Sequence, residues 1–189
     1  GILAASGDTG KGLLTLDLGM KIAYGSIGID TAFDATIVNN GNVVILTAED
    51  EKDEIHRRIE KLDTEGRRFR ETGCELYTVP FPDHGGVTPI VAIENGRPVI
   101  TDEWRQIERQ LLQMDNLALV VVDPLASFVL ADINADPSHG AFVTGYFASL
   151  ATKTKATFLM VHHMTKIDMK YPVRTPEHAR NLIRGTSAL

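Results

Sequence analysis

The chain has 189 residues, of which 43% are hydrophobic and 23% are charged, and these proportions are ordinary for a globular domain. The net charge of −6 at pH 7 excludes a basic surface over the whole domain, which a general nucleic-acid binder would carry. No apolar run approaches the ~20 residues that cross a bilayer, and the single cysteine, Cys74, cannot form an intrachain disulfide. We therefore expect one cytoplasmic domain over residues 1–189 without membrane contact. We also expect this domain to be truncated at both ends, and at the N-terminal end Gly1 already lies in an expected strand.

A glycine-rich loop separates the first two predicted elements. The apolar run 2–4 indicates a short strand, and an amphipathic helix is expected to begin at Lys11. The sequence between them, ASGDTGKG, is a form of the phosphate-binding pattern G-x-x-x-x-G-K-S/T. Glycines let backbone N–H groups approach phosphate oxygens, the helix N-terminus adds partial positive charge, and the lysine reaches the β- and γ-phosphates. The expected nucleotide contacts are Ser6, Gly7, Asp8, Thr9, Gly10, Lys11, Gly12 and Leu13.

Two residues of this loop depart from the pattern. Ala5 replaces the first glycine, which is tolerable where its φ is negative. Gly12 replaces the serine or threonine whose hydroxyl normally holds Mg²⁺, and this change is the more serious one. Thr15, one turn further along, is not expected to replace that hydroxyl. The alternative interpretation of the loop is a glycine-rich turn between a strand and a helix, with an exposed lysine.

Apolar runs and helical patterns alternate along the rest of the chain, which is typical of βαβ units. Further strands are expected at residues 43–47, 75–81, 117–122 and 157–161, and helices at 52–62, 101–114 and 138–153, the second of these capped by Thr101. Residues 25–41 are expected to be irregular, with a turn at 39–41, and loop 80–98 to hold a hairpin near residues 94–96. The fold class is therefore α/β, with a mostly parallel central sheet flanked by helices.

Polar side chains end three of these further strands. Glu49 follows the second strand, Asp123 ends the fourth, and His162 and His163 follow the fifth. Because the carboxyl ends of parallel strands meet at one edge of a sheet, we expect these side chains to gather beside Lys11. Each one alone has a structural explanation, since a polar residue must end any buried strand. Their convergence predicts a single site for a triphosphate, with the carboxylate of Asp123 positioned as in a Walker B strand.

Other groups near these strand ends have simpler explanations. Asp50 competes with Glu49 for a catalytic role but is expected to face the helix 52–62 as a cap. The HRRIEK stretch of that helix is expected to be a solvated face. The two adjacent histidines make a poor metal pair, because neighbouring residues of a strand point to opposite faces of the sheet.

The charge is distributed unevenly along the chain. Residues 150–189 carry seven Lys/Arg and two Asp/Glu, although the whole chain is acidic. A locally basic end on an acidic body suits a protein that touches a polyanion at one place. A solvated basic loop explains the same charge equally well.

The motifs SGDTGKG, ILTAEDEKDEIHRRI, LVVVDPLASF, FLMVHHMTK and IRGTSAL occur in that order. Together they resemble the RecA-like ATPases related to the plasmid replicative helicase RepA, within the broader RecA/DnaB group. The resemblance implies a RecA-like P-loop NTPase fold with ATP and Mg²⁺ as cofactors. It also implies that Lys11 binds phosphates, Glu49 polarises the attacking water, Asp123 holds Mg²⁺ through water, and His163 senses the γ-phosphate.

The same resemblance implies a homo-hexamer that acts on single-stranded DNA as a replicative helicase. Residues 164–184 resemble the loop that faces DNA in a ring's central channel, where phosphates would be neutralised by Lys166, Lys170, Arg174, Arg180 and Arg184. The competing hypothesis is a weakly hydrolysing or non-hydrolysing nucleotide-binding module with a regulatory or scaffold role, which Gly12 favours. A small-molecule P-loop kinase is less favoured, because no lid over an acceptor substrate is recognisable.

Overall fold

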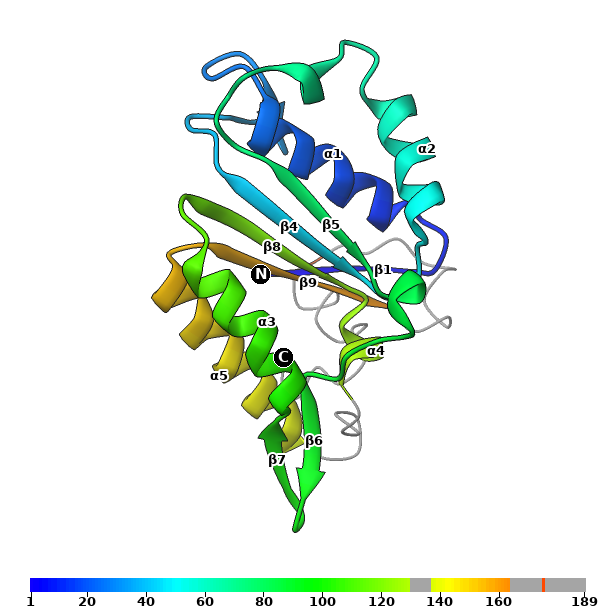
Figure 1. Ribbon diagram of the computed structural model, residues 1–189, viewed down its shortest axis with the longest axis vertical. Coiled ribbons are helices and arrows are strands. Elements are labelled where there is room, and N and C mark those ends of the chain that lie inside the picture. Colours follow the sequence, from blue (N-terminus) through cyan, green and yellow to red (C-terminus); the bar gives the residue numbers. More distant parts are fainter. Residues whose placement is uncertain (130–136, 164–174, 176–189) are drawn as a thin grey trace.

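The structure, a computed structural model, describes residues 1–129, 137–163 and 175. Five parallel strands form its central sheet in the order β1-β9-β8-β4-β5 (Figure 1). Their bounds are β1 Ile2–Ala5, β4 Asn42–Thr47, β5 Leu76–Pro80, β8 Leu117–Asp123 and β9 Thr157–His163. All four strand pairs within this sheet are parallel. The predicted α/β class is confirmed, and the arrangement is that of a RecA-like P-loop NTPase.

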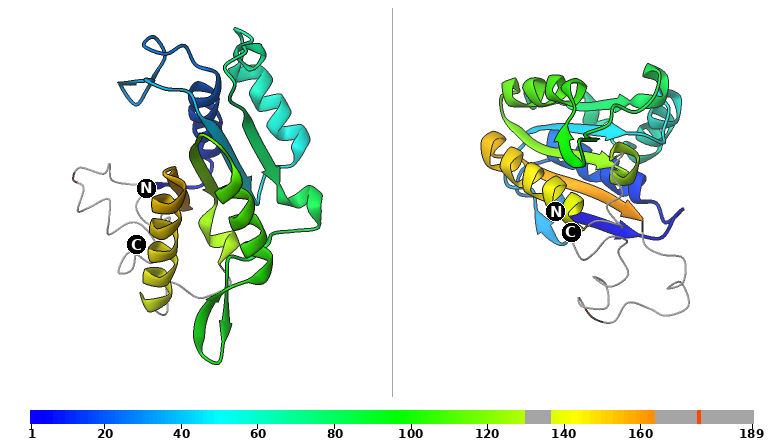
Figure 2. Two further views of the ribbon diagram at one scale, coloured as in Figure 1. Left: turned by 60° about the vertical axis from the view of Figure 1, so that its left-hand side comes forward. Right: turned by 90° about the horizontal axis from the view of Figure 1, so that it is seen from below.

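Helices cover both faces of this sheet (Figures 1 and 2). One face carries α1 (Lys11–Tyr24) and α2 (Lys52–Leu62). The other face carries α3 (Asp102–Gln113), α4 (Leu125–Phe128) and α5 (Pro137–Thr154). Two short 3₁₀ helices, η1 (Arg67–Phe69) and η2 (Phe81–His84), lie in the connections. None of the helices in the described part of the chain combines the length and apolar character that crossing a membrane requires.

Each face of the sheet has its own hydrophobic core. Along β4, Val43 and Ile45 pack in the cluster that contains α1, whereas Val44 and Leu46 pack in the cluster that contains α3 and α5. Alternate residues of a strand point to opposite faces, so a strand covered on both sides must be apolar throughout. This explains why its sequence is an uninterrupted apolar run. Trp104 of the later helix α3 is fully buried in the second of these clusters.

The expected capping and hairpin residues are confirmed. The Thr101 hydroxyl accepts a hydrogen bond of 3.2 Å from the backbone N–H of Trp104, so Thr101 is the N-cap of α3. The hairpin of β6 (Val91–Glu94) and β7 (Arg97–Ile100) turns at Asn95 and Gly96, whose φ values are 49° and 75°. Two consecutive positive φ values give the tight turn that joins twisted antiparallel strands. The hairpin projects away from the sheet (Figure 1).

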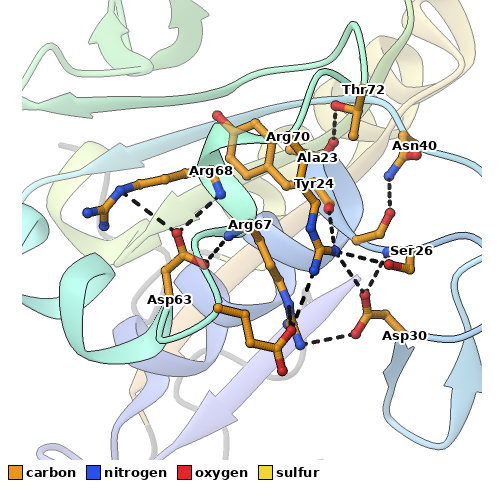
Figure 3. A network of polar contacts seen from close by, with 12 residues as sticks. Ala23, Tyr24, Ser26, Asp30, Asn40, Asp63, Arg67, Arg68, Arg70 and Thr72 are labelled. Atoms are coloured by element: carbon orange, nitrogen blue, oxygen red, sulfur yellow. Dashed lines mark hydrogen bonds and ion pairs between the residues drawn. The ribbon is translucent and has the colours of Figure 1, made fainter.

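Residues 25–41 contain order that the sequence did not predict. A two-stranded ribbon, β2 (Thr31–Ala32) and β3 (Ala35–Thr36), occupies the middle of this segment. Figure 3 shows the polar network that attaches the segment to the loop after α2. The carboxylate of Asp30 forms ion pairs with Arg67, at 3.1 Å, and with Arg70, at 3.9 Å. Arg67 and Arg70 are far from this segment in the sequence, so the residue pattern within 25–41 could not predict these contacts.

The strand register brings four carboxyl ends together. Thr47 of β4 is paired with Asp123 of β8, and Ala5 of β1 is paired with His163 of β9. Strand β9 lies between β1 and β8, so the strand that ends in histidine separates the glycine-rich loop from the strand that ends in aspartate. All the polar strand ends therefore face one edge of the sheet, as the sequence predicted.

Candidate functional site

The loop between β1 and α1 adopts a conformation that depends on glycine. Gly10 is the N-cap of α1 and has a φ of 81°, where a residue with a Cβ is strained. No side chain caps this helix end. A Cβ added at Gly7 or Gly10 would meet no atom within 4 Å, so the space beside the loop is open. The first backbone N–H groups of α1 therefore remain available to an anion.

Lys11 is the first residue of α1 and is buried although it is charged. Its ammonium group donates to the carbonyl oxygen of Ser6 at 2.6 Å and to that of Ala5 at 3.2 Å. The Thr9 hydroxyl donates to the same Ser6 carbonyl at 2.9 Å. These three bonds close the loop around its own carbonyl groups and fix the ammonium group beneath it. The loop itself therefore holds this cation in position.

The turn after β4 orients two carboxylates. The hydroxyl oxygen of Thr47 accepts hydrogen bonds from the backbone N–H groups of Glu49, at 3.4 Å, and Asp50, at 3.2 Å. This arrangement is a local side-chain turn that holds the two residues at the strand end. The Glu49 side chain is 58% exposed, so its carboxylate is accessible to water.

Asp123 is buried at the end of β8 and has an unusual environment. Burial, followed by the negative charges of Glu49 and Asp50, raises the pKa of its carboxyl group to about 6. The positive charges of Lys11 and His163 oppose this rise. A carboxylate that is destabilised by its neighbours has a high affinity for a cation, and this combination is typical of functional sites.

The two histidines at the end of β9 point in different directions. Nε2 of His163 lies 3.5 Å from Oε1 of Glu49, on the wall of the site. His162 is buried and does not line the site. This difference follows from the alternation of side chains along a strand.

Most of the residues predicted for nucleotide binding and catalysis line one pocket of about 370 Å³, a size within the range of about 300–1,000 Å³ that is typical of small-molecule sites. It is lined by Asp8, Thr9, Gly10, Lys11, Gly12, Leu13, Glu49, Asp50, Arg58, Asp123 and His163. Ser6 and Gly7, which were also predicted to contact the nucleotide, do not line it, and Ser6 contributes its carbonyl oxygen beneath the loop. Lys166, Lys170, Arg174, Arg180 and Arg184 lie outside the described residues.

Comparison with known protein families gives a match over most of the chain. The model of the family described as AAA domain matches residues 1–169. This chain belongs to the AAA domain family. A search of curated proteins found no match. The family assignment and the pocket together indicate a nucleotide-binding domain of the ATPase type.

The AAA domain has one pocket residue that the sequence analysis missed. Arg58, in the second turn of α2, has Nη1 2.5 Å from Oδ2 of Asp50 and Nε 2.8 Å from Oε1 of Glu54. Two predictions were therefore wrong in part. Asp50 faces α2 as expected, but it pairs with Arg58 and is not a cap, because the N-cap of α2 is Glu51 and no side chain caps it. The HRRIEK stretch is mostly exposed, but its Arg58 lines the pocket. The spacing of four between Glu54 and Arg58 predicts an ion pair but not its place on the pocket wall.

The donor set of this AAA domain fits Mg²⁺ only in part. Asp123 offers carboxylate oxygens at the pocket wall, but Gly12 has no hydroxyl. The Thr15 hydroxyl, one turn further along α1, donates to the Gly12 carbonyl at 2.9 Å, and Thr15 does not line this pocket. Among the described residues, no group of three His, Cys, Asp or Glu side chains is arranged to hold a metal ion. A magnesium ion here would take most of its ligands from phosphate oxygens and water.

Proposed function

We propose that this chain is the single RecA-like motor domain of a cytoplasmic, homo-hexameric replicative DNA helicase of the RepA type, driven by ATP hydrolysis. One observation carries the ATPase part of this proposal. Lys11, Glu49, Asp123 and His163 come from four different strand ends and line the same pocket as the glycine-rich loop. An ATPase needs a phosphate cradle, a base and a metal-facing carboxylate in that proximity.

In the proposed mechanism, the loop residues bind the triphosphate. Backbone N–H groups at the start of α1 surround the phosphate oxygens, and Lys11 neutralises the β- and γ-phosphates. Asp123 would hold Mg²⁺ through water, and the ion would supply neutralisation of the negative charge on the triphosphate. The raised pKa of Asp123 means that an incoming cation also relieves repulsion among the carboxylates.

Glu49 is the proposed general base. It takes a proton from a water molecule as the water oxygen bonds to the γ-phosphorus and the bond to the β,γ-bridging oxygen breaks. ADP and phosphate are the products. His163, 3.5 Å from Glu49, can donate a hydrogen bond to a γ-phosphate oxygen and is adjacent to residues 164–184, which are proposed to contact DNA. Its hydrogen bond would link the nucleotide state to that segment.

The DNA and oligomer parts of the proposal depend on charge and resemblance. The excess of Lys/Arg over Asp/Glu in residues 150–189 supports contact with a polyanion, and the resemblance implies that this polyanion is single-stranded DNA in the channel of a hexamer. Gly12 favours the second candidate, a nucleotide-binding module that hydrolyses slowly. The absent hydroxyl removes one ligand that orients Mg²⁺ during phosphoryl transfer.

The test is single-turnover ATP hydrolysis with Mg²⁺ by the parent chain and by Glu49→Gln. We expect the variant to bind ATP at least as tightly as the parent does, because it lacks one negative charge on the pocket wall. It should hydrolyse ATP at least about a hundredfold more slowly, because general bases contribute about 10²–10⁴-fold. Glu51→Gln is the matched control, since Glu51 is exposed and does not line the pocket. Equal rates for Glu49→Gln and the parent would exclude Glu49 as the base. A parent that binds ATP without turnover would favour the regulatory module.

A further inference from the structure

The space that a side chain at position 12 would occupy is bordered by an arginine. A Cβ added to Gly12 would lie 3.2 Å from Nη1 of Arg58. The same Cβ would lie 3.5 Å from Oδ2 of both Asp50 and Asp123. A contact of 3.2 Å is closer than ordinary van der Waals contact, so a serine or threonine would press against the guanidinium group in its present position. The absence of a side chain at position 12 therefore leaves room for the guanidinium group of Arg58.

Arg58 is held in this position by its own helix. Nε donates to Glu54 at 2.8 Å, one turn earlier on α2, and Nη1 donates to Asp50. Nη2 has no hydrogen-bond or ion-pair partner among the residues that the structure describes. The guanidinium group is planar and rigid, so fixing two of its nitrogens also fixes the direction of the third. The Arg58 side chain is 30% exposed and lines the same pocket as Lys11.

The charges on the pocket wall explain what the arginine does. Glu49, Asp50 and Asp123 are carboxylates on this wall, and they oppose the approach of a triphosphate. In a site with a hydroxyl at position 12, a bound divalent ion offsets that repulsion. Here a permanent cation is already beside Asp50, and an arginine is well suited to bind phosphate oxygens.

We propose that Arg58 takes the place of the side chain missing at position 12, pairing with Asp50 and donating from Nη2 to a triphosphate oxygen, so that nucleotide binding depends less on divalent cations. The inference rests on the proposed function in that the pocket must bind a nucleoside triphosphate. It concerns binding only, because hydrolysis retains its proposed need for Mg²⁺ beside Asp123. A purely structural role for Arg58, tying α2 to the turn 47–51, would leave the metal dependence of binding unchanged.

The test measures the affinity of the complete chain for a fluorescent ATP analogue, in Mg²⁺ and in EDTA. We expect the parent to lose less than about tenfold in affinity on removal of Mg²⁺. Arg58→Gln should weaken binding in EDTA by about tenfold to a hundredfold, as for loss of a charge-assisted hydrogen bond, and should weaken it less in Mg²⁺. Arg57→Gln is the matched control, since Arg57 is on the same helix, is 68% exposed and pairs with the same Glu54. Its affinities should equal those of the parent.

A second pair of variants tests the exchange of roles directly. Gly12→Ser combined with Arg58→Gln should recover binding in Mg²⁺ but not in EDTA, because the new hydroxyl is adjacent to Asp123. Gly12→Ser alone keeps the arginine and provides the measurement if Arg58→Gln fails to fold: its affinity in EDTA should fall as the serine displaces the guanidinium group.

Three outcomes would overturn the inference. In the first, Arg58→Gln matches the parent in both buffers, and in the second, the parent loses its affinity in EDTA as fully as the variant does. In the third, Gly12→Ser leaves the affinity in EDTA unchanged. The proposed function itself would fail differently, with no binding by the parent in either buffer, and the inference would then fall with it.

Discussion

At the scale of single residues, Asp123 shows how the site lowers the stability of the fold. Burial and the charges of Glu49 and Asp50 raise its pKa from 3.8 to about 6. The folded chain therefore holds this proton at pH values where the unfolded chain has released it. Folding stability falls as the pH rises from about 4 to about 6 and stays lower above that range. A rise of this size corresponds to about 2–3 kcal/mol.

The substitution Asp123→Asn removes the charge and keeps the shape of the side chain. In EDTA at pH 7.5 we expect it to raise the free energy of unfolding by about 2–3 kcal/mol, and the gain should vanish near pH 4. Thermal unfolding monitored by circular dichroism at both pH values measures this. Asp63→Ala is the control and should lower the free energy of unfolding. The buried carboxylate of Asp63 accepts hydrogen bonds from the backbone N–H groups of Arg67 and Arg68, at 2.6 and 3.1 Å, and the substitution removes both. A destabilised Asp123→Asn at pH 7.5 contradicts the prediction.

The residues of the site differ in how far the sequence could predict them. Glu49, Asp123 and His163 follow apolar runs directly, and parallel strands put such ends at one edge. Arg58 could not be found in this way. It lies on a helix, where periodicity separates a buried face from an exposed one, and the wall of a pocket is also an exposed face. Only the position of α2 beside the loop distinguishes Arg58 from the solvated Arg57.

At the scale of elements, the start of α1 was predicted from its glycines, whereas the segment 25–41 was not predicted in detail. The loop conformation is encoded locally, by a residue that must adopt a positive φ at the helix start. The ribbon β2–β3 instead depends on Asp30 meeting Arg67 and Arg70. Local patterns cannot reveal contacts between residues so far apart in the sequence.

One substitution at two glycines should have opposite effects on stability. Gly10→Ala puts a Cβ on a residue with a φ of 81° and should cost about 1–2 kcal/mol. Gly145→Ala falls in the interior of α5, at an exposed position where a Cβ meets no atom within 4 Å. It should add about 0.5–1 kcal/mol. Urea denaturation measures both, and a stabilised Gly10→Ala or a destabilised Gly145→Ala contradicts the assignment of backbone conformation.

At the scale of the whole molecule, the sheet separates the residues that stabilise the fold from the residues that form the site. Two cores, one on each face, hold five parallel strands in register, and their shared edge carries the site. The hydrophobic residues therefore hold in position a few polar residues, of which Asp123 lowers the stability of the fold. The family match ends at residue 169, so the basic segment 164–184, where DNA contact is proposed, lies mostly beyond it.

That segment should give DNA binding a defined dependence on salt. If all five of its basic side chains neutralise phosphates, log K for single-stranded DNA should fall with log salt with a slope of about −3.5, since each contact contributes about −0.7. Replacing Lys166 and Lys170 by glutamine should reduce the slope to about −2 and lower the affinity at every salt concentration. Titration of a fluorescent oligothymidine with the chain and a bound ATP analogue measures the slope. The same change of charge at Arg105 and Arg109, which are exposed on α3, should leave it unaltered. A slope near zero would mean that the segment does not bind DNA through its charges. Equal effects of the substitutions at Lys166/Lys170 and at Arg105/Arg109 would place DNA binding elsewhere on the chain. Neither outcome would affect the ATPase assignment, which has its own test.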